Sequence, residues 1–106
     1  MSEKVKNLPF EEVAAGYWKK IDPRLPTDLT DQQKIWLENY LQAQVAVNLG
    51  DFTETRKILT RLDNEDGFLL FEERHPDYFA TMDMVARGRT NRDRVKPLLT
   101  REDLNS

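Results

Sequence analysis

The amino-acid sequence predicts an all-α protein, a single small irregular bundle of about five helices built around a central helical hairpin. Apolar residues recur every three or four positions through most of the chain, which is the spacing of one face of an α-helix. Residues that start or stop helices alternate with these stripes, as at Thr30, Gly50 and Pro76. The length of 106 residues suits one core, so we expect residues 1–106 to form one domain, with 1–8 and 100–106 flexible.

The clearest apolar stripe predicts a helix over residues 10–21. Its members are Phe10, Val13, Ala14, Tyr17, Trp18 and Ile21. Pro23 and Pro26 follow, and proline removes a backbone donor and disfavours helix at the residue before it. We therefore expect residues 22–29 to be an extended connector.

The next two helices form the predicted hairpin, from Thr30 to Leu62. Thr30 and Gln33 have the spacing of a capping box at the start of a long helix. Gly50 supplies the left-handed residue that ends this helix, and the apolar pattern resumes after it. Because apolar side chains surround much of the long helix, we expect it to lie at the centre of the bundle.

Two further helical segments are expected after the hairpin. The apolar cluster at residues 68–71 fits either a strand or a short buried helix, and the charged residues after it favour a helix. Proline at Pro76 suits the first position of a helix, and Gly88 supplies a stop, so residues 76–87 are predicted to be helical.

The composition limits the kind of protein that this is. The chain has no cysteine, so its fold must be held by packing, without disulfides or thiolate metal sites. It is 39% apolar and 33% charged, which predicts a thin core under a charged surface. No apolar run reaches the roughly 18 residues of a membrane helix, and the charged residues 1–6 do not resemble a signal peptide. We expect a cytoplasmic protein that does not associate with membranes.

The charges are distributed unevenly along the chain. Residues 1–86 hold 10 basic and 16 acidic side chains, whereas residues 87–106 hold 6 basic and 3 acidic ones. The basic segment 87–96 contains Arg87, Arg89, Arg92 and Arg94. Such a segment can contact an acidic protein surface, the acidic body of its own chain, or nucleic-acid phosphates.

Three local patterns resemble functional sites but lack an essential feature: a calcium-binding loop, a lone histidine and pairs of adjacent acids. Residues 62–73 approach a calcium-binding loop, but Leu62 stands where the first aspartate ligand is required, so no metal or cofactor is expected. The lone His75, near Glu72 and Glu73, is the basis of an enzyme alternative with an acid–base site. Adjacent acids point about 100° apart on a helix and do not converge, so we expect no catalytic activity.

Residues 49–52, followed by Leu59, resemble the turn and second helix of a tetratricopeptide repeat, over about half of one repeat. The chain departs from that family's pattern at Asn39, Gln42, Thr55 and Leu62. Because a single repeat cannot bury its own apolar face, we expect an ordinary helical hairpin that shares this turn.

These observations predict a protein–protein interaction module, such as an adaptor, an inhibitor or an accessory subunit of a larger complex. We expect its partner to be another protein with an acidic surface, bound by Arg87, Arg89, Arg92 and Arg94, with Trp18 and Trp36 as apolar anchors if they are exposed. A homodimer is a further expectation, because thin-cored domains often gain stability by association. The alternative is a nucleic-acid-binding protein that uses segment 87–96, which is less favoured because the rest of the chain is acidic.

Overall fold

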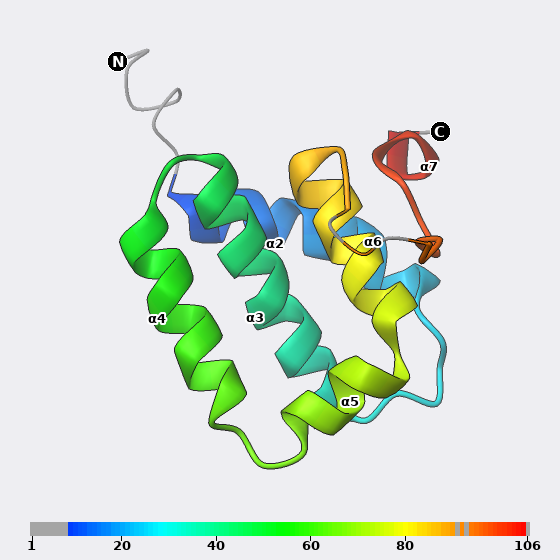
Figure 1. Cartoon of the computed structure of the whole chain (residues 1–106). Coiled ribbons are helices and arrows are strands. Elements are labelled where there is room, and N and C mark those ends of the chain that lie inside the picture. Colours follow the sequence, from blue (N-terminus) through cyan, green and yellow to red (C-terminus); the bar gives the residue numbers. More distant parts are fainter. Residues whose placement is uncertain (1–8, 91, 93, 106) are drawn as a thin grey trace.

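The computed structural model describes residues 9–90, 92 and 94–105, so the expected flexibility of residues 1–8 lies outside the described residues. Within this part the chain forms α-helices and one short 3-10 helix, without a strand. These elements are α2 (Phe10–Ile21), η1 (Asp22–Arg24), α3 (Asp31–Asn48), α4 (Phe52–Asp63), α5 (Phe68–Arg74), α6 (Pro76–Arg87) and α7 (Arg101–Asn105). Figure 1 shows the helices gathered into one irregular bundle, which confirms the all-α prediction.

The α3–α4 hairpin forms through the signals that the sequence predicted. The backbone N–H of Gln33 donates to the Thr30 hydroxyl at 3.1 Å, and the Gln33 side chain accepts from the Thr30 N–H at 3.0 Å. This reciprocal pair satisfies two donors at the start of α3. Gly50 has a φ of 87°, the left-handed conformation needed to turn the chain into α4.

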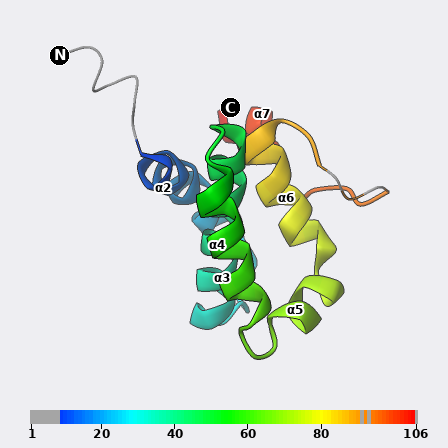
Figure 2. The ribbon, with the colours of Figure 1, turned by 60° about the vertical axis from the view of Figure 1, so that its left-hand side comes forward.

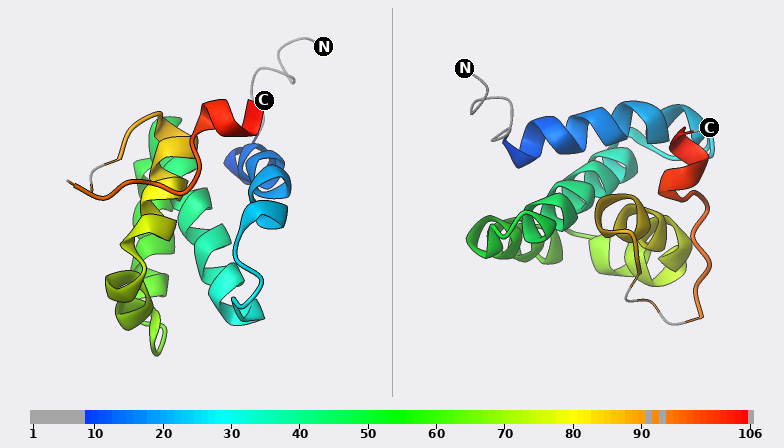
Figure 3. Two further views of the ribbon diagram at one scale, coloured as in Figure 1. Left: turned by 90° about the vertical axis from the view of Figure 1, so that its right-hand side faces the viewer. Right: turned by 90° about the horizontal axis from the view of Figure 1, so that it is seen from above.

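The central helix of the bundle is α3, as predicted. It packs against α4, α6 and α2, and Figure 1 shows it between α4 and α6. The view from above in Figure 3 shows α2 crossing one side of this layer. Leu37, Leu41 and Ala43 on α3 are fully buried as a result.

Aromatic side chains fill the part of the core where α5 meets α3 and α6, at the bottom of the view in Figure 1. Phe68 and Phe71 of α5 are buried and lie 5.8 and 5.6 Å from the Trp36 ring of α3. Phe79 of α6 packs edge-on against Tyr40 at 4.9 Å. The apolar cluster 68–71 is therefore part of a short helix with one buried side, because a helical turn brings both phenylalanines to the same side while Leu69 and Leu70 stay exposed.

The connector 22–29 is less extended than predicted. Residues 22–24 continue from α2 as the 3-10 helix η1, with Pro23 in its first turn, where a missing N–H costs nothing. Leu25 then turns into the core and is buried.

The C-terminal end contains a further short helix, whereas the sequence predicted that residues 100–106 are flexible; Ser106 lies outside the described residues. Residues 101–105 form α7, which Thr100 and Asp103 begin by exchanging backbone-to-side-chain hydrogen bonds of 3.3 and 2.9 Å. Leu104 is buried in the core, and the Arg24 guanidinium donates to the Asp103 carbonyl at 2.6 Å. A single turn has no periodicity that a sequence could reveal, and this one is stabilised by contacts with distant residues.

Residues 94–100 pass α6 on their way to α7, as the left view of Figure 3 shows. Gly88, with a φ of 75°, ends α6 in the left-handed conformation. Farther along, the Leu98 N–H donates to the Thr81 hydroxyl of α6 at 2.8 Å. The segment is thus tied to the helix that it follows.

We expect Leu104→Ala to lower the free energy of unfolding by about 2 kcal/mol, at the low end for buried leucine because a short terminal helix can shift to fill the space. Leu98→Ala is the matched control, since Leu98 is 43% exposed and should cost less than about 0.5 kcal/mol. Urea unfolding of both variants measures the difference, and equal effects would show that α7 is not packed on the bundle.

Candidate functional site

A cluster of polar side chains lies inside the bundle, between α3, α6 and the segment after α6. Asp83 of α6 is only 2% exposed, and one carboxylate oxygen accepts a hydrogen bond from the Tyr40 hydroxyl at 2.8 Å. The other oxygen accepts from the Thr90 hydroxyl at 3.3 Å and lies 3.6 Å from Nε of Arg92. Since an unpaired buried carboxylate is costly, these contacts make the position tolerable.

Arg92, predicted to bind a partner, belongs to this internal cluster. Its guanidinium forms an ion pair of 2.7 Å with Glu72 and donates to the Tyr40 hydroxyl at 3.3 Å. It also lies over the Tyr40 and Phe79 rings, 5.7 and 5.3 Å from their centres. Arg92 is therefore occupied by acidic and aromatic groups of its own chain.

The cluster changes the protonation of two of its members. Burial raises the pKa of Asp83, although the Tyr40 hydrogen bond and the charge of Arg92 act in the opposite direction. Burial, together with the negative charge of Asp83, also raises the pKa of Tyr40. Asp83 is thus easier to protonate than an ordinary aspartate, and Tyr40 is harder to ionise than an ordinary tyrosine.

The other three arginines of the predicted partner surface differ in how they are placed. Arg87 is half-buried, and its guanidinium donates to the Gln44 side chain at 3.4 Å. Arg89 and Arg94 are exposed. The four arginines are therefore divided between internal contacts and solvent, although they follow one another closely in the sequence.

The two tryptophans were predicted to be apolar anchors if exposed, and they differ in exposure. Trp36 is 8% exposed, and its indole N–H reaches Glu65 at 3.5 Å. Trp36 also lines two small hollows of about 200 and 220 Å³. Trp18 is half-buried and packs against the core. Trp36 is therefore part of the aromatic core, because it lies on the side of α3 that packs against Phe68 and Phe71 of α5.

The residues of the enzyme alternative are engaged in separate contacts. The Glu72 carboxylate is paired with Arg92, and Glu73 is exposed. The His75 ring stacks parallel to the Tyr78 ring, with centres 4.8 Å apart. The structure thus supplies a packing role for His75 and an ion-pairing role for Glu72.

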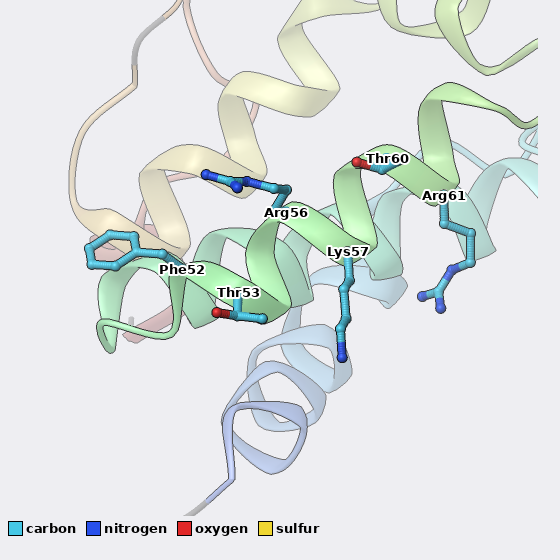
Figure 4. Close-up of a pocket in the computed structure, with 6 residues that line it drawn as sticks. All are labelled: Phe52, Thr53, Arg56, Lys57, Thr60 and Arg61. Atoms are coloured by element: carbon cyan, nitrogen blue, oxygen red, sulfur yellow. The ribbon is translucent and has the colours of Figure 1, made fainter.

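A second cationic surface lies on the outer side of α4, and we call it the α4 face. It is a shallow hollow of about 540 Å³, shown in Figure 4, whose lining residues are Phe52, Thr53, Arg56, Lys57, Thr60 and Arg61. All six belong to one helix, so the hollow is an open surface. Figure 2 brings α4 to the front and shows no other described element over it.

The inner side of α4 explains why these six residues point outward. Thr55, Ile58 and Leu62 are buried against α3, at the spacing of one helical face. The Thr55 hydroxyl hydrogen-bonds the Ala43 carbonyl of α3 at 3.2 Å and the Asp51 carbonyl at 2.9 Å. Because α4 packs mainly on α3, its opposite side has no partner helix in the described part of the chain.

The α4 face is positively charged and carries an exposed aromatic ring. Phe52 is 65% exposed, and Arg56, Lys57 and Arg61 are all exposed. Lys57 lies 3.7 Å from Glu54, in a solvent-exposed pair of the kind that contributes little to stability. Among the described residues, no ion pair is formed by Arg56 or Arg61. These two cations are therefore available to an anionic ligand.

Sequence reasoning missed the α4 face, although part of the signal was there. The apolar spacing in residues 52–62 fixes which side of the helix is buried, and Arg56, Lys57 and Arg61 fall on the other side. What the spacing does not show is that α4 lies at the edge of the bundle. Only the tertiary arrangement separates a cationic face open to a partner from one covered by a neighbouring helix.

No family model, curated protein or solved structure matches this chain. None of the described helices has the length and apolar character needed to cross a membrane. Over the same residues, there is no group of three or more His, Asp or Glu side chains placed to hold a metal ion.

The raised pKa of Asp83 predicts a specific pH dependence. Above the folded-state pKa, the folded protein bears the full cost of the buried charge, and this cost is removed as the pH falls through that pKa toward the ordinary value of 3.8. We therefore expect the stability of the wild type relative to Asp83→Asn to rise as the pH is lowered.

Urea unfolding of both proteins between about pH 4 and pH 7 measures this difference, since the range spans the ordinary and a raised aspartate pKa. A relative stability that falls on acidification would mean that Arg92 and Tyr40 dominate over burial and depress the pKa of Asp83.

Proposed function

We propose that this protein is an interaction module, acting as an adaptor, an inhibitor or an accessory subunit, and that its α4 face binds an acidic segment of another protein in the cytoplasm. The observation that supports this proposal is the set of exposed cations Arg56, Lys57 and Arg61 beside the exposed ring of Phe52. Arginine and aromatic side chains are the types that dominate binding energies at interfaces. The remaining surface of the protein is acidic overall, which orients an acidic partner toward this face.

A second copy of the chain is a poor occupant for the same face. Symmetric association places the same surface of both subunits in contact. Here it would bring Arg56, Lys57 and Arg61 against their own counterparts. The mutual repulsion of these cations favours a different partner, one that supplies carboxylates.

A nucleic-acid-binding role is the second candidate, and the exposure of Arg89 and Arg94 supports it. These arginines follow α6, whereas Figure 1 shows α4 on the other side of α3. The two candidate surfaces can therefore be changed separately. A phosphate ligand at segment 87–96 would depend on Arg89 and Arg94, and an acidic protein at the α4 face would not.

The test uses two charge-reversal variants and two labelled probes. One variant carries Arg56→Glu, Lys57→Glu and Arg61→Glu, and the other carries Arg89→Glu and Arg94→Glu. The probes are a synthetic peptide of Glu, Ala and Leu with Glu at every fourth position, and a short DNA duplex. Fluorescence anisotropy gives the dissociation constants, and circular dichroism checks that each variant is folded.

We expect the α4 variant to weaken peptide binding by about tenfold or more, since three partly exposed ion pairs of about 0.5 kcal/mol each amount to that factor. The Arg89/Arg94 variant should bind the peptide as the wild type does. If the DNA duplex binds instead, and only the Arg89/Arg94 variant loses it, the nucleic-acid alternative is the better description.

A further inference from the structure

The side chains of the α4 face form two parallel rows. Positions four apart lie above one another on a helix, so one row consists of Phe52, Arg56 and Thr60. The second row consists of Thr53, Lys57 and Arg61. Figure 4 shows Phe52 and Arg56 along one edge of the hollow and Thr53, Lys57 and Arg61 along the other. The hollow is therefore the groove between two rows spaced by four residues.

The side chains of the two rows differ in size, and the smallest ones mark a path across the hollow. The small residues Thr53 and Thr60 stand at diagonally opposite corners of the six-residue surface. A line from Thr53 to Thr60 passes between Arg56 and Lys57. The two larger side chains at the other corners, Phe52 and Arg61, lie on opposite sides of this line.

We infer that the partner segment is an α-helix that crosses the α4 face along this diagonal, an inference that rests on the proposed function. Helices pack by fitting the side chains of one between those of the other, so their axes come closest where the facing side chains are small. The low corners at Thr53 and Thr60 allow the crossing helix to approach. Its backbone hydrogen bonds are already satisfied, which suits a surface made only of side chains.

The chemistry of the two sides specifies the partner helix more closely. On one side, Phe52 offers an exposed ring to an apolar side chain, and Arg56 lies one turn farther along. On the other side, Lys57 and Arg61 are also one turn apart. The complementary helix is amphipathic and acidic, with carboxylates one turn apart toward Lys57 and Arg61 and an apolar residue toward Phe52.

The test compares three peptides that carry the same number of carboxylates. The first is the Glu-Ala-Leu peptide with Glu at every fourth position, the second is a scrambled version of it, and the third has a central Ala→Pro change that breaks the helix. We expect the first to bind at least about fivefold more tightly than the other two. The scrambled peptide loses the one-turn spacing of carboxylates that matches Lys57 and Arg61, and the proline peptide bears the cost of ordering a helix.

A variant that changes the shape of the groove and leaves its charge unaltered provides the second measurement. Thr53→Gln with Thr60→Gln raises both low corners with uncharged side chains that favour helix. It should weaken the helical peptide about fivefold or more and leave the proline-containing peptide unchanged. Thr27→Gln, at an exposed threonine in the connector before α3, is the control and should change neither.

The outcomes separate this inference from the proposed function. Equal binding of all three peptides, lost in the Arg56/Lys57/Arg61 variant, would overturn the helical partner and keep the acidic one. Failure of every peptide to bind would overturn both. Concentration-dependent dimerisation that the same variant abolishes would also overturn the inference, because a second copy would then occupy the groove.

Discussion

The burial of α3 is the constraint on which the rest of the bundle depends. Leu37, Leu41, Ala43 and Ala46 lie on different sides of this helix and are all fully buried, so it must be covered from several directions. Three helices supply that cover, with α4 and α6 on opposite sides and α2 across a third. Among the described helices, α4 packs mainly on α3, and none covers its outer side. The exposed outer face of α4 is therefore a consequence of how the core is built.

A second consequence is that the protein uses its cations in two ways. Asp83 is buried close to α3, and a buried carboxylate is stable only when hydrogen bonds and a positive charge surround it. Arg92 supplies that charge and also pairs with Glu72, so one arginine ties the segment after α6 to two helices. Neither Arg56 nor Arg61 on α4 pairs with a buried carboxylate in the described structure. Arg92 is therefore held by acids of its own chain, whereas Arg56 and Arg61 remain exposed.

Much of the fold could be predicted because its signals are local. The stripe over residues 10–21, the capping pair Thr30 and Gln33 and the glycine at Gly50 each act within a few positions, and the structure confirms all three. The C-terminal helix α7 was missed because distant contacts stabilise it. The candidate site was harder to predict than the helices, because it too depends on contacts between distant residues. Sequence order groups Arg92 with exposed arginines, and only tertiary packing shows that it faces inward while the cations of α4 face outward.

The measurement that tests this account most directly is the hydrogen-exchange rate of the arginine Nε–H groups, observed by NMR spectroscopy in the free protein. We predict a slowly exchanging Nε–H for Arg92, because this atom is buried 3.6 Å from the Asp83 carboxylate while the rest of the guanidinium is held by Glu72 and Tyr40. The exposed side chains of Arg56 and Arg61 should give rapidly exchanging signals. The variant Glu72→Gln should accelerate exchange at Arg92 alone. Rapid exchange at Arg92 in the wild type, or protection of Arg56 and Arg61, would contradict the division of cations on which the proposed binding face depends.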